Sequence, residues 1–304
     1  MIPLKVENQF AFSDKERNID VYIKREDLIH PFVSGNKFRK LKYNLAEAKK
    51  QNCKTLLTFG GAFSNHIAAV AFAGKAEGFK TIGIIRGDEL GEKIDDNPTL
   101  KFASESGMQF EFVSREMYRN KMGEAFLLSM KEKFGDFYLI PEGGTNELAV
   151  KGCTEILTEE DEKFNYIACA VGTGGTIAGI IKSSLPIQQV LGFPTLKGDF
   201  LQNEIRNFVT ETNFQLINGF EFGGYGKVTE ELITFMNDFY DETKILLDPI
   251  YTAKMVFGVR SLIDKGFFPD HTKILLIHTG GIQGIAGMNQ LLEKKKLPKI
   301  NRND

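Results

Sequence analysis

The chain repeats one pattern three times: a short apolar run, a glycine-rich turn, and then a segment with apolar residues at helical spacing. The units are KTLLTF, GGAFSN and HIAAVAFAGKAEGF at 54–79; NYIACAV, GTGG and TIAGIIKSSL at 165–185; and TKILLIHT, GGIQG and IAGMNQLLEKK at 272–295. Apolar runs at 81–87, 110–113 and 137–144 predict further strands. Buried strands that alternate with helices are typical of parallel sheets. We therefore predict an α/β fold with mostly parallel sheets flanked by helices.

The segment NKFRKLKYNLAEAKK at 36–50 predicts an amphipathic helix. Four apolar residues recur at helical spacing and form one stripe: Phe38, Leu41, Leu45 and Ala48. Asn36 is the expected N-cap of this helix. The basic residues Arg39, Lys40 and Lys42 fall away from the stripe, so we expect them to be solvated.

Lys37 stands apart from these other basic residues, because it lies at the edge of the apolar stripe in the first helical turn. The helix dipole disfavours a positive charge there, and partial burial also favours the neutral amine. A neutral amine is a nucleophile. The alternative is a lysine whose stem covers apolar surface while its ammonium group reaches water, and the helix by itself favours this alternative.

Composition and charge argue against some classes of function but do not identify one. The chain has 304 residues, 42% of them hydrophobic and 26% charged, with a net charge of −2, so no global basic field indicates nucleic-acid binding. The three cysteines form no CxxC pair, which is typical of reduced thiols in a cytosolic setting. The first ten residues lack the apolar core of a signal peptide, and no apolar run approaches about 18 residues. We expect a cytoplasmic protein without a membrane span.

The loop VGTGGTIAG at 171–179 is the best candidate for an anion site. It follows an apolar strand and opens a helix, so glycine amides and the helix N-terminus can approach a phosphate. A dinucleotide fingerprint needs glycine at 177, where the chain has Ile177, and a Walker A loop needs Gly-Lys-Ser/Thr at its end. The loop therefore fits a single phosphate better than a pyrophosphate or triphosphate. A tight turn that serves packing alone remains an equal alternative.

The loop FGGAFSNHIAA at 59–69 is similar but ends in Ser64, Asn65 and His66. These residues either cap the helix that follows or hold a substrate carboxylate with their side chains and amides. No GxSxG motif supports a serine hydrolase. The four histidines show no metal-ligand spacing, so we expect no catalytic metal.

A nucleophilic lysine, a single-phosphate loop and a carboxylate loop together indicate pyridoxal phosphate (PLP). The chain resembles the fold-type II PLP enzymes, related to the tryptophan synthase β-subunit, and within them the 1-aminocyclopropane-1-carboxylate deaminase and D-cysteine desulfhydrase family. The motifs that carry the resemblance appear in order along almost the whole chain: IKREDL at 23–28, SGNKFRKL at 34–41, GGAFSNH at 60–66, PEGGTN at 141–146, VGTGGT at 171–176, DPIYTAK at 248–254 and HTGG at 278–281.

The resemblance implies roles for individual residues. Lys37 matches the lysine that forms the Schiff base with PLP, and Asn65 matches the residue that hydrogen-bonds the 3′-oxygen of the cofactor. Thr279 matches a position near the pyridine nitrogen, and Tyr251 matches the active-site tyrosine. The phosphate cradle corresponds to five consecutive residues: Gly172, Thr173, Gly174, Gly175 and Thr176. A second set matches residues that receive the substrate: Ser64, Asn65, His66 and Tyr251. Lys37, Ser64 and Tyr251 are the implied catalytic residues.

Two positions bear on the substrate. Tyr251 is followed by Thr252, where the ring-opening deaminases have glutamate, and the serine loop reads SNH rather than SNQ. Both features resemble the D-cysteine desulfhydrase branch. We therefore expect β-elimination from a small amino acid to give a 2-oxo acid and ammonia, with sulfide from D-cysteine. The alternatives are a 1-aminocyclopropane-1-carboxylate deaminase and, from another class, a non-catalytic PLP-binding regulator. A nucleotide-binding oxidoreductase is disfavoured by Ile177.

The resemblance also implies an organisation. Residues 1–44 and 148–304 are expected to form a larger PLP-binding domain, and residues 45–147 a smaller one, with the active site in the cleft between them. The family further implies a homodimer that acts on a small amino acid, without a nucleic-acid or membrane partner.

Overall fold

The computed structural model describes residues 5–196, 198 and 200–301, so the outermost ends of the expected larger domain lie outside the described residues. Ten strands form two separate sheets within this part of the chain. The larger sheet has the strand order β1-β2-β10-β7-β8-β9. Its strands, in that order, are Asn8–Asp14, Ile19–Lys24, Lys273–Ile277, Tyr166–Val171, Gln189–Pro194 and Phe214–Leu216. All neighbouring strands are parallel except β1, which pairs antiparallel with β2.

The smaller sheet is wholly parallel and has the order β5-β4-β3-β6. Its strands, in that order, are Met108–Val113, Lys80–Arg86, Thr55–Gly60 and Tyr138–Ile140. The predicted strand at 137–144 is therefore too long. It ends at Ile140 because Pro141 offers no backbone N–H, and Gly143 and Gly144 adopt positive φ in a short 3₁₀ turn.

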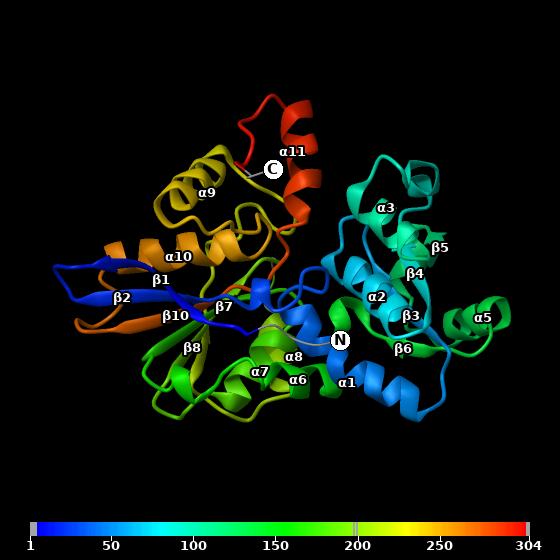
Figure 1. Cartoon of the computed structure of the whole chain (residues 1–304), viewed down its shortest axis with the longest axis horizontal. Helices are drawn as coiled ribbons and strands as arrows, with labels where there is room; N and C mark the ends of the chain where they lie inside the picture. The colour runs from blue at the N-terminus through cyan, green and yellow to red at the C-terminus, as the bar shows by residue number, and fades with distance from the viewer. Residues whose placement is uncertain (1–4, 197, 199, 302–304) are drawn as a thin grey trace.

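Helices cover both faces of each sheet (Figure 1). The α-helices α1 to α11 are Asn36–Lys50, Asn65–Ala76, Pro98–Glu105, Arg115–Arg119, Glu124–Phe134, Glu147–Cys153, Gly175–Ser183, Phe200–Arg206, Glu230–Thr243, Thr252–Asp264 and Gly284–Lys294. The 3₁₀ helices η1 to η4 are Glu26–Leu28, Asp88–Lys93, Glu142–Gly144 and Glu159–Asp161.

Each sheet face has its own apolar core, because alternate side chains of a strand point to opposite faces. On the larger sheet, one core packs against α9, α10 and α11, and the other against α6, α7 and α8. On the smaller sheet, one core packs against α1, α2 and α3, and the other against α4 and α5. The two-sided burial explains why the strands read as continuous apolar runs. The predicted α/β fold with two mostly parallel sheets is confirmed.

Helix α1 links the two halves, since it packs against α6 on one side and α2 on the other. The expected domain boundary at residue 44 falls inside α1, and both boundaries stay a prediction. No helix in the described ranges is long and apolar enough to cross a membrane.

Candidate active site

A cavity of about 580 Å³ is lined by residues from both sheets. The glycine turns after β3, β7 and β10 open into it, as expected for the carboxyl ends of parallel strands. Nearly all of the predicted site residues line this cavity: Lys37, Ser64, Asn65, His66, Gly172, Thr173, Gly174, Thr176, Tyr251 and Thr279. Gly175 does not line it and instead packs against Thr145.

The start of α1 is set by Gly35 rather than by Asn36, so the predicted N-cap is wrong. Gly35 has φ 60° and ψ −142°, and no side chain caps the helix. A Cβ at Gly35 would lie 2.0 Å from the carbonyl oxygen of Thr279. Only glycine therefore permits the helix to begin this close to the turn after β10. The close approach places the first turn of α1 at the cavity wall.

Asn36 does not cap α1, and its side chain instead hydrogen-bonds to Thr176 and Lys37. Its Nδ2 donates to Thr176 Oγ1 at 2.8 Å, and its Oδ1 accepts from Lys37 Nζ at 3.0 Å. Burial, followed by the positive charge of Lys40, lowers the pKa of Lys37 to about 7. A substantial fraction of the amine is thus neutral near pH 7 and able to act as a nucleophile. The structure thus places Lys37 at the cavity wall, and its part in the reaction stays a prediction.

Lys40 is buried, with 2% exposure, so the prediction that it is solvated is wrong. Its Nζ donates to Gly143 O at 2.9 Å and to Thr145 Oγ1 at 3.0 Å. Thr145 Oγ1 in turn lies 2.6 Å from Thr173 Oγ1 in the glycine loop. Lys40 lies one turn after Lys37 and lines the same cavity. The sequence missed this second lysine because α1 has more than one buried face.

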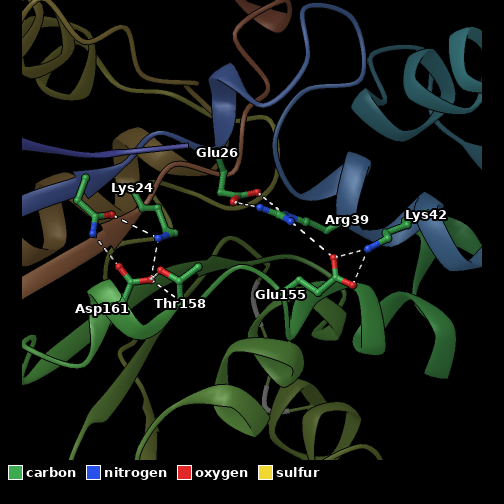
Figure 2. Close-up of polar contacts among 8 residues, drawn as sticks. Lys24, Glu26, Arg39, Lys42, Glu155, Thr158 and Asp161 are labelled. Atoms are coloured by element: carbon green, nitrogen blue, oxygen red, sulfur yellow. Dashed lines mark hydrogen bonds and ion pairs between the residues drawn. The ribbon is translucent and has the colours of Figure 1, made fainter. Parts of the chain in front are cut away.

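Arg39 is also more buried than predicted, and it belongs to an ion network behind the site (Figure 2). Its guanidinium donates two hydrogen bonds to fully buried Glu26, at 3.0 and 2.8 Å. The third guanidinium nitrogen, Nη1, lies 3.7 Å from Glu155, which also pairs with the exposed Lys42. Lys42 alone of the three basic residues is solvated as expected. The network fixes α1 against the segment after β2.

A separate buried pair lies at the end of β2. Lys24 Nζ is 2.6 Å from Asp161 Oδ2, and both side chains are almost fully buried. Asp161 also accepts hydrogen bonds from the backbone and side chain of Thr158 (Figure 2). The charged IKREDL segment at 23–28 therefore stabilises the contact between the larger sheet and the segment that contains Thr158 and Asp161.

The glycine loop after β7 leads directly into α7. Gly174 is the N-cap, with φ 83°, and the first-turn amides of α7 have no partner within the helix. A Cβ at Gly175 would lie 2.8 Å from Thr145 Oγ1, so the loop is close-packed on one side and open to the cavity on the other. Free amides and a helix N-terminus form a ready anion site.

The serine loop begins α2. Ser64 is its N-cap and accepts a hydrogen bond from Ile67 N at 3.4 Å, while Asn65 Oδ1 accepts from Gln283 Nε2 at 3.0 Å. The capping role expected for Ser64 is therefore present, and its side chain still faces the cavity.

His66 is buried beside the serine loop, and Thr58 decides its tautomer. Thr58 Oγ1 donates its proton to Ile140 O at 2.8 Å. His66 Nε2, also 2.8 Å from that hydroxyl, must therefore be the donor to it. Burial, and then the charges of Lys37 and Lys40, hold the pKa of His66 well below its usual value. The imidazole is neutral at the cavity wall.

Tyr251 lies at the start of α10, where Asp248 holds it. Asp248 Oδ1 accepts from the backbone nitrogens of Tyr251 at 2.6 Å and Thr252 at 3.2 Å. Burial raises the pKa of the Tyr251 hydroxyl well above its usual value, so it remains protonated. Thr252 is fully buried and does not line the cavity.

Tyr225 is a cavity residue that the sequence interpretation missed. Its ring meets that of Tyr251 edge to face, with centroids 6.0 Å apart, and it is 42% exposed at the cavity rim. The only signal in the sequence is the FGGYG run at 222–226. In that run an aromatic residue stands among glycines, outside any predicted helix or strand.

No group of three or more His, Cys, Asp or Glu side chains in the described part of the chain is arranged to hold a metal ion.

Known proteins resemble both the sequence and this structure. A Thermotoga maritima protein with a provisional 1-aminocyclopropane-1-carboxylate deaminase name is 33% identical, over 90% of this chain and 92% of its own. The mitochondrial bifunctional D-cysteine desulfhydrase/1-aminocyclopropane-1-carboxylate deaminase of Arabidopsis thaliana is 32% identical, over 88% of this chain and 73% of its own. A crystal structure of an ACC deaminase homologue superimposes with a TM-score of 0.83 at 29% identity, and covers 96% of this chain and 94% of that one. Residues 5–280 match the pyridoxal-phosphate dependent enzyme family, and the chain belongs to this family.

Proposed function

We propose that this protein is a PLP-dependent lyase that acts on a small amino acid, by a β-elimination like that of D-cysteine desulfhydrase. The observation that carries the proposal is Lys37, whose pKa burial lowers to about 7, in a cavity that also contains a glycine-rich anion site. The names of the relatives support this reaction class. The products would be a 2-oxo acid and ammonia, with sulfide when the substrate is D-cysteine.

The residues of the cavity fit PLP. The reactive amine of Lys37 suits the aldehyde of the cofactor, and the open amides at 172–176 suit its phosphate. Lys40 adds a positive charge that reaches the same loop through Thr145 and Thr173. We assign the 3′-oxygen of the cofactor to Asn65 and the surroundings of its pyridine nitrogen to Thr279. A neutral hydroxyl at Thr279 does not favour a charged pyridinium.

The chain supplies the groups that select which bond breaks. When bound, PLP provides an electron sink for the bonds at the α-carbon of the substrate. Lys37 Nζ, once free, is placed to accept the α-proton as a general base. The Ser64–His66 loop, which lines the cavity, would receive the substrate carboxylate, with Ser64 close to the reacting carbons. Tyr251, a protonated hydroxyl, orients the leaving group or returns a proton to it.

The second candidate is a 1-aminocyclopropane-1-carboxylate deaminase, since both curated relatives described above include that activity in their names. Thr252 argues for the desulfhydrase: its hydroxyl is 2.8 Å from Asp248 N and serves the start of α10, whereas the ring-opening branch has glutamate here. A non-catalytic PLP-binding protein would not need Ser64 or Tyr251 in the cavity. We further propose a two-domain organisation split near residues 45 and 147, a homodimer, and a cytoplasmic location.

Two measurements test the proposal. Release of 2-oxo acid and ammonia is followed with D- and L-cysteine, other small amino acids and the cyclopropane substrate. Fastest turnover of D-cysteine is expected, fastest turnover of the cyclopropane selects the second candidate, and no turnover with bound cofactor selects the non-catalytic class. Lys37→Ala should abolish the visible absorbance of bound PLP, whereas Lys42→Ala, an exposed lysine on the same helix, should retain it. An unchanged spectrum in Lys37→Ala would remove Lys37 from the mechanism.

A further inference from the structure

Tyr225, which lines the cavity at its rim, belongs to residues 217–229, which we call the rim segment. It joins β9 to α9 and contains no helix or strand. Its four glycines all have positive φ: Gly219, Gly223, Gly224 and Gly226. Such a backbone has much conformational freedom in the absence of regular hydrogen bonds. Within the segment, turn hydrogen bonds from Gly224 N to Glu221 O and from Lys227 N to Gly224 O lie on either side of Tyr225, and a contact from outside the segment adds to them.

Lys254 of α10 supplies that contact. Its side chain is 1% exposed, and its Nζ donates to Glu221 O at 2.8 Å and to Gly224 O at 2.9 Å. The second of these carbonyl groups belongs to the residue directly before Tyr225. Burial lowers the pKa of Lys254 to about 8, and the nearby Asp248 and Glu221 oppose that shift, so the amine is still mostly protonated at pH 7. A buried ammonium needs such acceptors, and its hydrogen bonds are strong because they are charge-assisted.

The rim segment has further contacts on both sides of Tyr225, among them Val228 with the core of the larger sheet and Tyr225 itself with Tyr251. Phe222 meets Phe257 of α10 edge to face at 4.9 Å between centroids, and Phe220 lies 6.4 Å from the same ring. These aromatic contacts hold the first part of the segment to α10. The carbonyl contacts of Lys254 hold the backbone directly before Tyr225. Lys254 also follows Tyr251 by three residues, which puts both on one side of α10.

We propose that Lys254 is a positioning residue for the reaction: it holds the rim segment so that the Tyr225 hydroxyl faces the substrate next to Tyr251. The start of α10 would thus place both tyrosines, Tyr251 directly and Tyr225 through the ammonium of Lys254. The inference rests on the proposed function, because Tyr251, the partner of Tyr225, is assigned to substrate chemistry there.

The test is a double-mutant cycle in the PLP-loaded enzyme. Tyr225→Phe, Lys254→Met and the double variant are compared for kcat/KM and for PLP affinity, with Lys182→Met on exposed α7 surface as the matched control. We expect Lys254→Met to lower kcat/KM by about tenfold or more in the wild-type background and by less than about twofold in the Tyr225→Phe background. PLP affinity and cofactor absorbance should stay within about twofold of wild type, because Lys254 does not line the cavity.

Equal losses in the two backgrounds, or full activity in Lys254→Met, would overturn the proposal, since a merely structural lysine would act independently of Tyr225. If Lys254→Met does not fold, Lys254→Gln, which keeps a donor on a shorter side chain, enters the same cycle with the same criterion.

A second readout does not depend on turnover. Hydrogen exchange of the backbone amides at 217–229 should accelerate in Lys254→Met and not in Lys182→Met, and unchanged exchange would refute the positioning role. A wild-type enzyme that turns over no amino acid would contradict the proposed function, and hydrogen exchange would still decide whether Lys254 holds the rim segment.

Discussion

The buried pair of Glu26 and Arg39 allows a quantitative test of how α1 is held in place (Figure 2). Glu26 is fully buried, and its two oxygens accept hydrogen bonds of 2.8 and 3.0 Å from Arg39. Arg39→Met keeps most of the apolar stem and removes the guanidinium. A charge left buried without its partner costs about 3–5 kcal/mol. The Arg39 side chain is 14% exposed, so water can partly replace it, and we expect destabilisation by about 3 kcal/mol at neutral pH.

The loss should depend on pH. Burial raises the pKa of Glu26 even with Arg39 present, and removal of the positive charge must raise it further. A carboxyl group with a higher pKa in the folded state makes folding less favourable as the pH rises from its unfolded pKa through its folded one. Relative to wild type, Arg39→Met should therefore be least stable above neutral pH and should regain much of the loss at about pH 5.

Urea unfolding of the PLP-loaded protein at about pH 5 and about pH 7.5 measures both effects. Lys42→Met is the matched control, because Lys42 lies on the same helix and pairs with Glu155, but its side chain is 47% exposed. Such a pair contributes at most about 1 kcal/mol. Adding Glu26→Gln to Arg39→Met removes the unpaired charge and should restore part of the stability. A loss no larger than that of the control, or equal at both pH values, would refute the reasoning.

Two further predictions concern cofactor binding. Uptake of PLP by the apoprotein, followed by absorbance, should accelerate about tenfold from about pH 6 to about pH 8 and then level off. The reason is that burial lowers the pKa of Lys37 to about 7. A rate that still climbs steeply above about pH 9 would indicate an ordinary lysine. Gly175→Ala should weaken PLP binding by about tenfold or more, because the added Cβ would lie 2.8 Å from Thr145 Oγ1 and force the loop away from Thr145. An unchanged dissociation constant in an absorbance titration would exclude this loop as the phosphate site.

Local chemistry along the chain sufficed to predict much of this protein. The three units of strand, glycine turn and helix are present, because buried parallel strands need apolar residues on both faces and the turns need glycine. The helix predicted at 36–50 is present, with its N-cap one residue earlier than expected, at Gly35. Lys37 at the start of that helix, and the spacing that excludes a dinucleotide loop after β7, are also readable from residues alone.

Tertiary packing decided what those patterns leave open. One apolar stripe predicts one buried face, yet α1 lies between α6 and α2 and buries Lys40 as well. Gly143 and Thr145, in the turn after β6, supply acceptors for its ammonium group. Tyr225 and Lys254 carry no periodic signal. Lys254 contacts the irregular segment that carries Tyr225 where that segment meets α10, about thirty residues later in the sequence. Such long-range contacts are set by the packing of the whole fold rather than by neighbouring residues.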